Sequence, residues 1–178
     1  GARARTGPGG ARCGPRWAAG AALGAATPLD GIPVDAPGAW LGTASTGPAY
    51  DATLQALRDL GLSQDSLAAR GIRILRVGMP YPLGAGLVRE FASGLEQLLV
   101  VEEKTSFLES QVKDILYGVA GAPAVSGKRG PDGRLLCPPH GQSTADRLDG
   151  VLRSLLGARV ETAPPNPPPR PPPPVARG

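Results

Sequence analysis

The sequence predicts an α/β fold: a small, mostly parallel sheet with helices packed on its faces. Two short apolar runs rich in β-branched residues lie within residues 71–83 and 98–104. Such runs are typical of strands that are buried on both faces of a parallel sheet. Strand, helix and strand of this length form a right-handed crossover unit. The helix between the runs places one apolar stripe on a single face: Leu83, Leu87, Val88, Phe91 and Leu95.

The chain before this unit predicts a short strand followed by a helix. Residues 32–41 contain two prolines and read as an extended entry, and a short strand follows at residues 39–44. A turn at residues 45–48 supplies hydroxyl groups for helix capping and a proline suited to a first helical turn. We therefore expect a helix at about residues 48–60, ended by Gly61.

The other predicted elements are short and amphipathic. Ser63 is the expected cap of a second helix, which Gly71 closes. A weak strand and a charged turn separate the last two helices. In chain order, these elements are a helix at residues 62–70, a helix at residues 107–117, a strand at residues 122–127, an extended segment at residues 135–141 and a helix at residues 144–156.

The net charge of +4 comes from the two ends of the chain. Residues 1–29 hold four arginines and no acidic residue, and only two arginines follow Glu161. The part between them has 13 basic and 15 acidic residues. We expect a disordered Gly/Ala/Arg-rich tail at residues 1–29, the α/β domain at residues 30–161 and a disordered Pro-rich tail at residues 162–178.

The composition argues against nucleic-acid and membrane proteins. The central part has no basic run of the kind that binds nucleic acid, and no apolar run approaches 18 residues. Cys13 and Cys137 stand far apart, which fits a reducing compartment, and we expect a cytoplasmic protein. Cys137 and His140 have a metal-like spacing, but two ligands joined by two prolines make no site. Because Met79 is the only methionine, the chain is either processed or a piece of a longer protein.

Three loops are expected at the carboxyl ends of the strands, where open parallel sheets bind ligands: residues 45–48, 79–82 and 102–106. In the first loop, Ser45, Thr46 and Gly47 precede a helix and are candidates for contact with an anion or with an interface. The alternative is a capped helix without a ligand.

In the third loop, Glu102 and Glu103 are candidates for a general base or for a charge partner of a cationic cofactor ring. Adjacent carboxylates on a strand point to opposite faces, so at most one enters a site. The alternative is a solvated or salt-bridged glutamate. With one histidine and no phosphate-binding glycine loop, the sequence shows no catalytic constellation and no metal site.

Several segments of the chain carry a family likeness: residues 36–42, 45–50, 56–62, 78–83, 100–104, 107–113, and 127–129 with 132–133. Together they resemble the transketolase-C-terminal-like region of indolepyruvate ferredoxin oxidoreductase. The likeness runs in order over about residues 30–157.

This resemblance implies a parent enzyme that uses thiamine diphosphate, magnesium, iron–sulfur clusters and coenzyme A. Such enzymes oxidatively decarboxylate aryl 2-oxoacids to acyl-CoA and pass electrons to ferredoxin. The family's diphosphate-binding G-D-G…N motif and its cysteine runs are absent from this chain. We therefore expect a non-catalytic domain or fragment, with no cofactor of its own, whose partners are the other domains or subunits of the oxidoreductase. The alternative is a degenerate stand-alone interaction module that recruits a partner through its Pro-rich tail.

Overall fold

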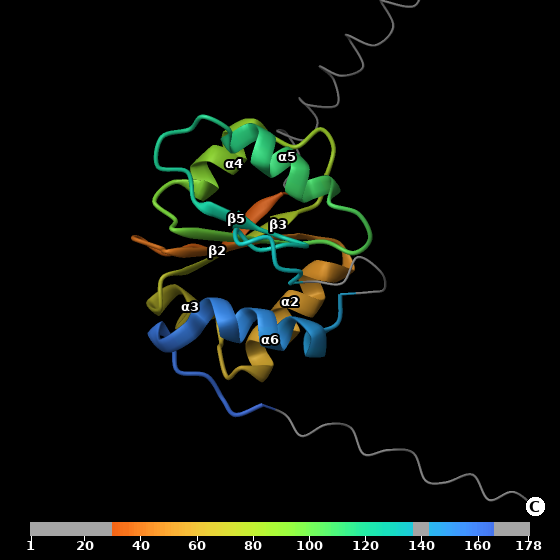
Figure 1. Ribbon diagram of the computed structural model, residues 1–178. Helices are drawn as coiled ribbons and strands as arrows, with labels where there is room; N and C mark the ends of the chain where they lie inside the picture. Colours follow the sequence, from red (N-terminus) through yellow and green to blue (C-terminus); the bar gives the residue numbers. More distant parts are fainter. Residues whose placement is uncertain (1–29, 137–142, 166–178) are drawn as a thin grey trace, which may run out of the picture.

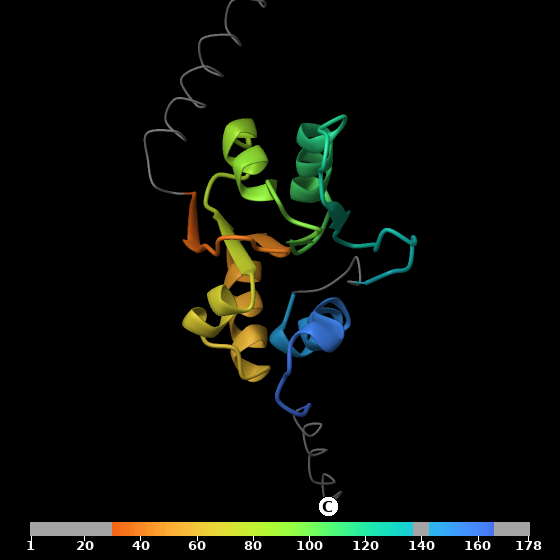
Figure 2. The same ribbon diagram turned by 90° about the vertical axis from the view of Figure 1, so that its left-hand side faces the viewer.

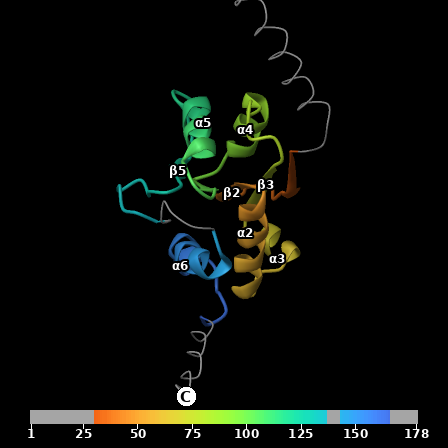
Figure 3. The ribbon, with the colours of Figure 1, turned by 90° about the vertical axis from the view of Figure 1, so that its right-hand side faces the viewer.

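The computed structural model describes residues 30–136 and 143–165, which form a sheet between two layers of helices (Figure 1). The same layers are seen after a quarter turn in either direction (Figure 2 and Figure 3). One face is covered by α4 (Ala85–Ala92) and α5 (Phe107–Leu116). The other face is covered by α2 (Pro48–Asp59), α3 (Gln64–Ala69) and α6 (Ala145–Leu156). The predicted α/β class is confirmed.

The sheet has the strand order β1-β3-β2-β4-β5. Its strands are β1 (Gly31–Val34), β2 (Leu41–Thr46), β3 (Ile72–Val77), β4 (Gln97–Val101) and β5 (Ala124–Ser126). All neighbouring strands are parallel except β1, which pairs antiparallel with β3. The sheet is therefore mostly parallel, as the sequence predicts.

The predicted crossover connects β3 to β4 through α4, and β2 lies between these two strands. The connection from β2 to β3 runs through α2 and α3 on the opposite face of the sheet. The chain thus passes from β2 to β3 over one face and returns past β2 to β4 over the other, so the strand order reverses between β2 and β4. This makes the carboxyl ends of β2 and its neighbours the place where such folds bind ligands.

Two apolar clusters form the core, one on each face of the sheet. Ile72 and Ile74 of β3 contribute to the cluster under α2 and α6, and Leu75 and Val77 contribute to the cluster under α4 and α5. Phe91, on the predicted stripe of α4, is fully buried. Burial of β3 and β4 on both faces explains why their sequences are nearly continuous apolar runs.

Three details differ from the sequence prediction. Residues 31–34, expected as part of an extended entry, form the edge strand β1, which tolerates the exposed Pro33 because an edge strand has one side without a ladder partner. The second strand begins at Leu41 rather than at residue 39, because a tight turn joins the N–H of Ala39 to the carbonyl oxygen of Ala36. The fold also continues past residue 161, since the N–H of Ala163 donates to the carbonyl oxygen of Leu60.

Candidate functional site

The three predicted loops leave the sheet at one edge. Thr46 at the end of β2 pairs in register with Val77 at the end of β3, and Ser45 pairs with Val101 at the end of β4. The strands therefore end side by side. Open parallel sheets bind ligands outside the carboxyl ends of their strands, so this edge is the candidate site.

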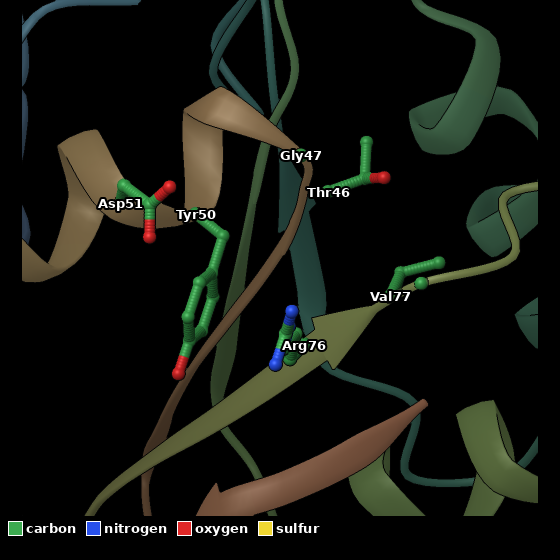
Figure 4. Close-up of a pocket in the computed structure, with 7 residues that line it drawn as sticks. Thr46, Gly47, Tyr50, Asp51, Arg76 and Val77 are labelled. Carbon is green, nitrogen blue, oxygen red and sulfur yellow. The ribbon is translucent and has the colours of Figure 1, made fainter. Parts of the chain in front are cut away.

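A cavity of about 500 Å³ opens at this edge, between the ends of β2 and β3 and the first turn of α2 (Figure 4). Its size is in the range of small-molecule sites. The guanidinium carbon of Arg76 lies 5.4 Å from the centroid of the Tyr50 ring, a cation–π contact. The lining residues are Thr46, Gly47, Tyr50, Asp51, Arg76, Val77 and Gly78.

The predicted turn of Ser45, Thr46 and Gly47 contributes to this cavity through its last two residues. Ser45 is fully buried in β2, and its Oγ has no hydrogen-bond partner among the described residues. Gly47 is the N-cap of α2 with φ of 52°, a value that favours glycine, and no side chain caps this helix. The hydroxyl capping expected from the sequence is therefore wrong. The serine lies within the strand, and the chain turns at the glycine.

Glu102 and Glu103 have different environments, as expected for neighbours at a strand end. The Glu102 carboxylate is buried and accepts hydrogen bonds from the N–H of Leu108 at 2.7 Å and of Glu109 at 3.0 Å. It therefore caps the N-terminus of α5, where a carboxylate also interacts favourably with the helix dipole. Glu103 is half-buried, and its carbonyl oxygen accepts from the Lys128 ammonium. This capping role is neither of the roles weighed from the sequence.

Sequence reasoning missed Glu109 and Lys128, which join this loop to α5 and to the segment after β5. Glu109 accepts hydrogen bonds from Lys113 Nζ at 2.5 Å and from the backbone N–H of Lys128 at 3.0 Å. Burial acts to raise the pKa of Glu109, but hydrogen bonds from Lys113, Lys128 and Ser106 together lower it below its usual value. The i,i+4 spacing of Glu109 and Lys113 was a usable sequence signal. The hydrogen bond between Glu109 and Lys128 joins residues 19 positions apart, and no sequence pattern indicated it.

The loop at residues 79–82 presents aromatic surface beside the cavity edge. Gln111 holds this loop, since its amide nitrogen donates to the carbonyl oxygen of Pro80 at 2.8 Å and its amide oxygen accepts from the N–H of Leu83 at 3.3 Å. Tyr81 and Phe107 are 51% and 48% exposed, and the centroids of their rings are 5.7 Å apart. Two large apolar rings are thus held together at the surface.

The described residues contain no group of three or more His, Cys, Asp or Glu side chains arranged to hold a metal ion. Within residues 30–136 and 143–165, no helix combines the length and the apolar character that crossing a bilayer requires. Cys13, Cys137 and His140 lie outside the described residues, as do residues 1–29 and most of the predicted Pro-rich tail.

Known proteins are similar to the central part of this chain. The subunit IorA of indolepyruvate oxidoreductase from Methanothermobacter marburgensis is 43% identical over 72 residues, which are 40% of this chain and 10% of that subunit. The subunit IorA from Methanothermobacter thermautotrophicus is 36% identical over 112 residues, 63% of this chain and 14% of that subunit. The chain thus spans about a seventh or less of the length of these relatives.

A solved structure, the 2-oxoglutarate:ferredoxin oxidoreductase from Magnetococcus marinus, aligns with a TM-score of 0.47 and 11% identity. The alignment covers 72% of this chain and 20% of that chain. Residues 33–158 match the family described as the indolepyruvate oxidoreductase domain, and this match covers most of the chain. The chain therefore belongs to the indolepyruvate oxidoreductase domain family.

Proposed function

We propose that this chain is an accessory, non-catalytic domain of a cytoplasmic indolepyruvate:ferredoxin oxidoreductase. In this proposal the remainder of the parent enzyme oxidatively decarboxylates aryl 2-oxoacids to acyl-CoA, with ferredoxin and coenzyme A as partners. The chain docks onto that remainder through the carboxyl edge of its sheet. Family membership supports the choice of parent enzyme.

The observation that carries the docking role is the exposed pair of Tyr81 and Phe107. Exposed aromatic rings held in a fixed geometry are typical anchors of protein interfaces. They stand at the edge where Asp30, the first described residue, accepts hydrogen bonds from the N–H groups of Gly78 and Met79 at 2.7 and 3.0 Å.

An accessory role is supported by the way the acidic residues at this edge are used. Glu102, the sequence candidate for a general base, has both carboxylate oxygens occupied by N–H groups of α5. Glu109 pairs with Lys113. The chain has two cysteines, whereas an iron–sulfur cluster takes four thiolates. Residues 30–136 and 143–165 hold no group of acidic, cysteine or histidine side chains for magnesium or a cluster, and we assign these cofactors and thiamine diphosphate to the rest of the parent enzyme.

The test is capture of the parent polypeptide by the tagged full chain, with a double variant that removes the two rings. We expect the unmodified chain to recover, from its native cell extract, a polypeptide that carries thiamine diphosphate and iron–sulfur clusters. The captured material should reduce ferredoxin when given an aryl 2-oxoacid and coenzyme A. Tyr81→Ser with Phe107→Ser should reduce the recovery at least about tenfold, as expected for loss of interface anchors.

Tyr117→Ser is the matched control, because Tyr117 is 90% exposed at the opposite end of α5. This variant should recover the parent polypeptide as well as the unmodified chain does. Equal recovery by the double variant, with its fold verified by circular dichroism, would contradict docking at this edge. If deletion of residues 166–178, which leaves the contacts of Thr162 and Ala163 in place, abolished recovery while the ring variants did not, the alternative of an interaction module with a Pro-rich recruiting tail would replace this proposal.

A further inference from the structure

We propose that Tyr81 and Phe107, here called the ring pair, form a binding surface for polyproline II. The occupant is the proline segment, residues 164–174, of a second copy of this chain. This inference goes beyond the docking role given above, because it assigns the ring pair a ligand that the chain itself carries. It concerns copies of this chain alone and does not depend on their place in an oxidoreductase.

The ring pair has the features of a proline-binding surface. Tyr81 and Phe107 are about half exposed, and their rings are inclined at 48° to each other. Because the rings do not stack flat, apolar ring surface stays open to a partner. Domains that bind polyproline II segments present exposed aromatic rings against which prolines pack. The ring pair therefore offers the side chains that such recognition uses.

One glutamine holds both rings in place. The amide nitrogen of Gln111 donates to the carbonyl oxygens of Pro80 at 2.8 Å and Phe107 at 3.3 Å. Its amide oxygen accepts from the N–H of Leu83 at 3.3 Å. The loop that carries Tyr81 is thus tied to the helical turn that begins with Phe107. A surface fixed in this way loses little conformational entropy when a ligand binds.

The proline segment is a matching ligand. Nine of its eleven residues are proline, and Arg170 stands between two proline runs. Proline fixes the backbone φ, so such a sequence favours polyproline II before any partner is met. Pro164 and Pro165, the described start of the segment, are exposed. The chain therefore contains both a proline-rich ligand and a surface that suits it.

Charge also favours this pairing. The proline segment carries Arg170 and no acidic side chain, whereas residues 30–161 hold 15 acidic and 13 basic residues. Glu103 precedes Phe107 by four residues, and among the described residues only its backbone carbonyl has a bonding partner. The neighbouring Lys104 has the charge of the arginine and acts against the contact. We expect Arg170 to lie on the Glu103 side of the ring pair.

The place where the proline segment begins points to a second copy as its partner. Arg159, shortly before it, pairs with Glu96 at 2.9 Å and lies over the ring of Trp40. Those two residues precede β4 and β2, so the chain here is at the amino edge of the sheet, on the side of α6. The ring pair stands at the carboxyl edge beside α5, on the opposite face (Figure 1). Since the prolines begin at residue 164, no linker precedes them that could carry the segment around the sheet.

The experiment is a titration of the dilute full chain, labelled with ¹⁵N, with a synthetic peptide of residues 163–175. We expect saturable shifts of the amide signals of Tyr81, Glu103 and Phe107. A peptide with serine at every second proline keeps the charge and loses the fixed backbone, so it should bind at least about tenfold more weakly. In sedimentation, the full chain should associate as its concentration rises, and a variant that lacks residues 166–178 should remain monomeric.

Matched variants assign the binding to the ring pair. Tyr81→Ser and Phe107→Ser should each weaken peptide binding at least about tenfold, the expected effect of losing an aromatic anchor. Tyr117→Ser, which alters an exposed ring at the other end of α5, should leave the affinity unchanged. Glu103→Gln should weaken binding of the natural peptide more than binding of a peptide with Arg170→Gln, because the second peptide lacks the partner charge.

The proposal is overturned if the peptide gives no saturable shifts at these amides, or if the ring variants bind it as well as Tyr117→Ser does. Association that persists without residues 166–178 would also contradict it. If a ring variant unfolds, as judged from its own spectrum, a peptide with a nitroxide label decides on the unmodified chain: it must broaden the signals of Tyr81 and Phe107 before that of Tyr117. Because no other protein is present, these outcomes are independent of capture of the parent polypeptide.

Discussion

The ammonium group of Lys128 lies 2.6 Å from the carbonyl oxygen of Glu102, although 26 residues separate them in the sequence. The same nitrogen lies 2.5 Å from the carbonyl oxygen of Glu103. Lys128 itself is buried. A buried lysine in this position joins the segment after β5 to the loop after β4. It donates to two carbonyl oxygens, of which that of Glu102 also accepts a longer hydrogen bond, 3.3 Å, from the Ser143 hydroxyl.

Replacement of this lysine should therefore destabilise the fold. We expect Lys128→Met, which retains most of the side-chain volume, to lower the free energy of unfolding by about 1–3 kcal/mol, because the Glu103 carbonyl loses its ammonium donor and the Glu102 carbonyl loses the shorter of its two hydrogen bonds. Urea unfolding followed by circular dichroism measures the change. Lys104→Met, at an exposed position in the same loop, is the control and should change stability by less than about 0.5 kcal/mol. Equal effects of the two variants would contradict the bridging role.

Glu102 should behave as a helix cap. Glu102→Ala leaves two N–H groups of α5 without acceptors and should lower the free energy of unfolding by about 1–2 kcal/mol. Glu102→Gln keeps one acceptor oxygen and should lower the free energy of unfolding by less than Glu102→Ala does. Glu103→Gln is the matched control at the neighbouring position, and we expect little change in its unfolding curve. If Glu102→Ala were as stable as the unmodified chain, its carboxylate would be available for another role, such as the general base considered from the sequence.

The ionised form of Glu109 should stabilise the fold in a pH-dependent way. Its pKa is lower in the folded chain than the ordinary value of 4.5, so its contribution is fully present above that value and is lost as pH falls through the folded-state pKa. We therefore expect the free energy of unfolding to decrease as pH is lowered below 4.5. The decrease should be smaller in Glu109→Gln than in the control Glu90→Gln, which alters an exposed glutamate of α4. Identical pH profiles for the two variants would contradict this role.

The hydroxyl of Thr43 offers a test of an unpartnered polar group. Thr43 is fully buried in β2, and its Oγ1 has no partner among the described residues. Thr43→Val removes this hydroxyl at nearly constant shape and should raise the free energy of unfolding by about 1 kcal/mol. In Thr53→Val, the lost hydroxyl is one that donates to the carbonyl oxygen of Ala49 at 2.7 Å, so we expect no gain. Thermal unfolding of the two variants distinguishes these cases.

Much of the fold was predictable because its signals are local. The apolar runs around Ile72 and Leu98 identified two strands, and the stripe through Phe91 identified the helix between them. Ser63 was recognised as a cap, and its Oγ does accept a hydrogen bond from the N–H of Ser66. Edge strand β1 was missed because residues 31–34 include a proline and have no strong apolar alternation. Only their pairing with β3 makes them a strand.

The candidate site was predictable in part. Parallel strands all end at the same edge of a sheet. The strands predicted from the sequence therefore placed the loops around Gly47, Pro80 and Glu102 at one edge, as the structure has them. Arg76 and Tyr50 carried no signal, since an exposed arginine and a helical tyrosine are common. They are in contact, and line one cavity, because the tertiary structure places β3 beside β2.

The sequence by itself determined the α/β class, the order of most elements and the likeness to the oxidoreductase family, because these follow from periodicity and from residues close together in the chain. Tertiary structure alone decided how individual polar side chains are used. Glu102 caps a helix, Lys128 is buried and joins two loops, and the Ser45 hydroxyl has no hydrogen-bond partner within the described part of the chain. The physical reason is that hydrogen-bonding and burial depend on groups brought together by packing, and these partners are distant in the sequence.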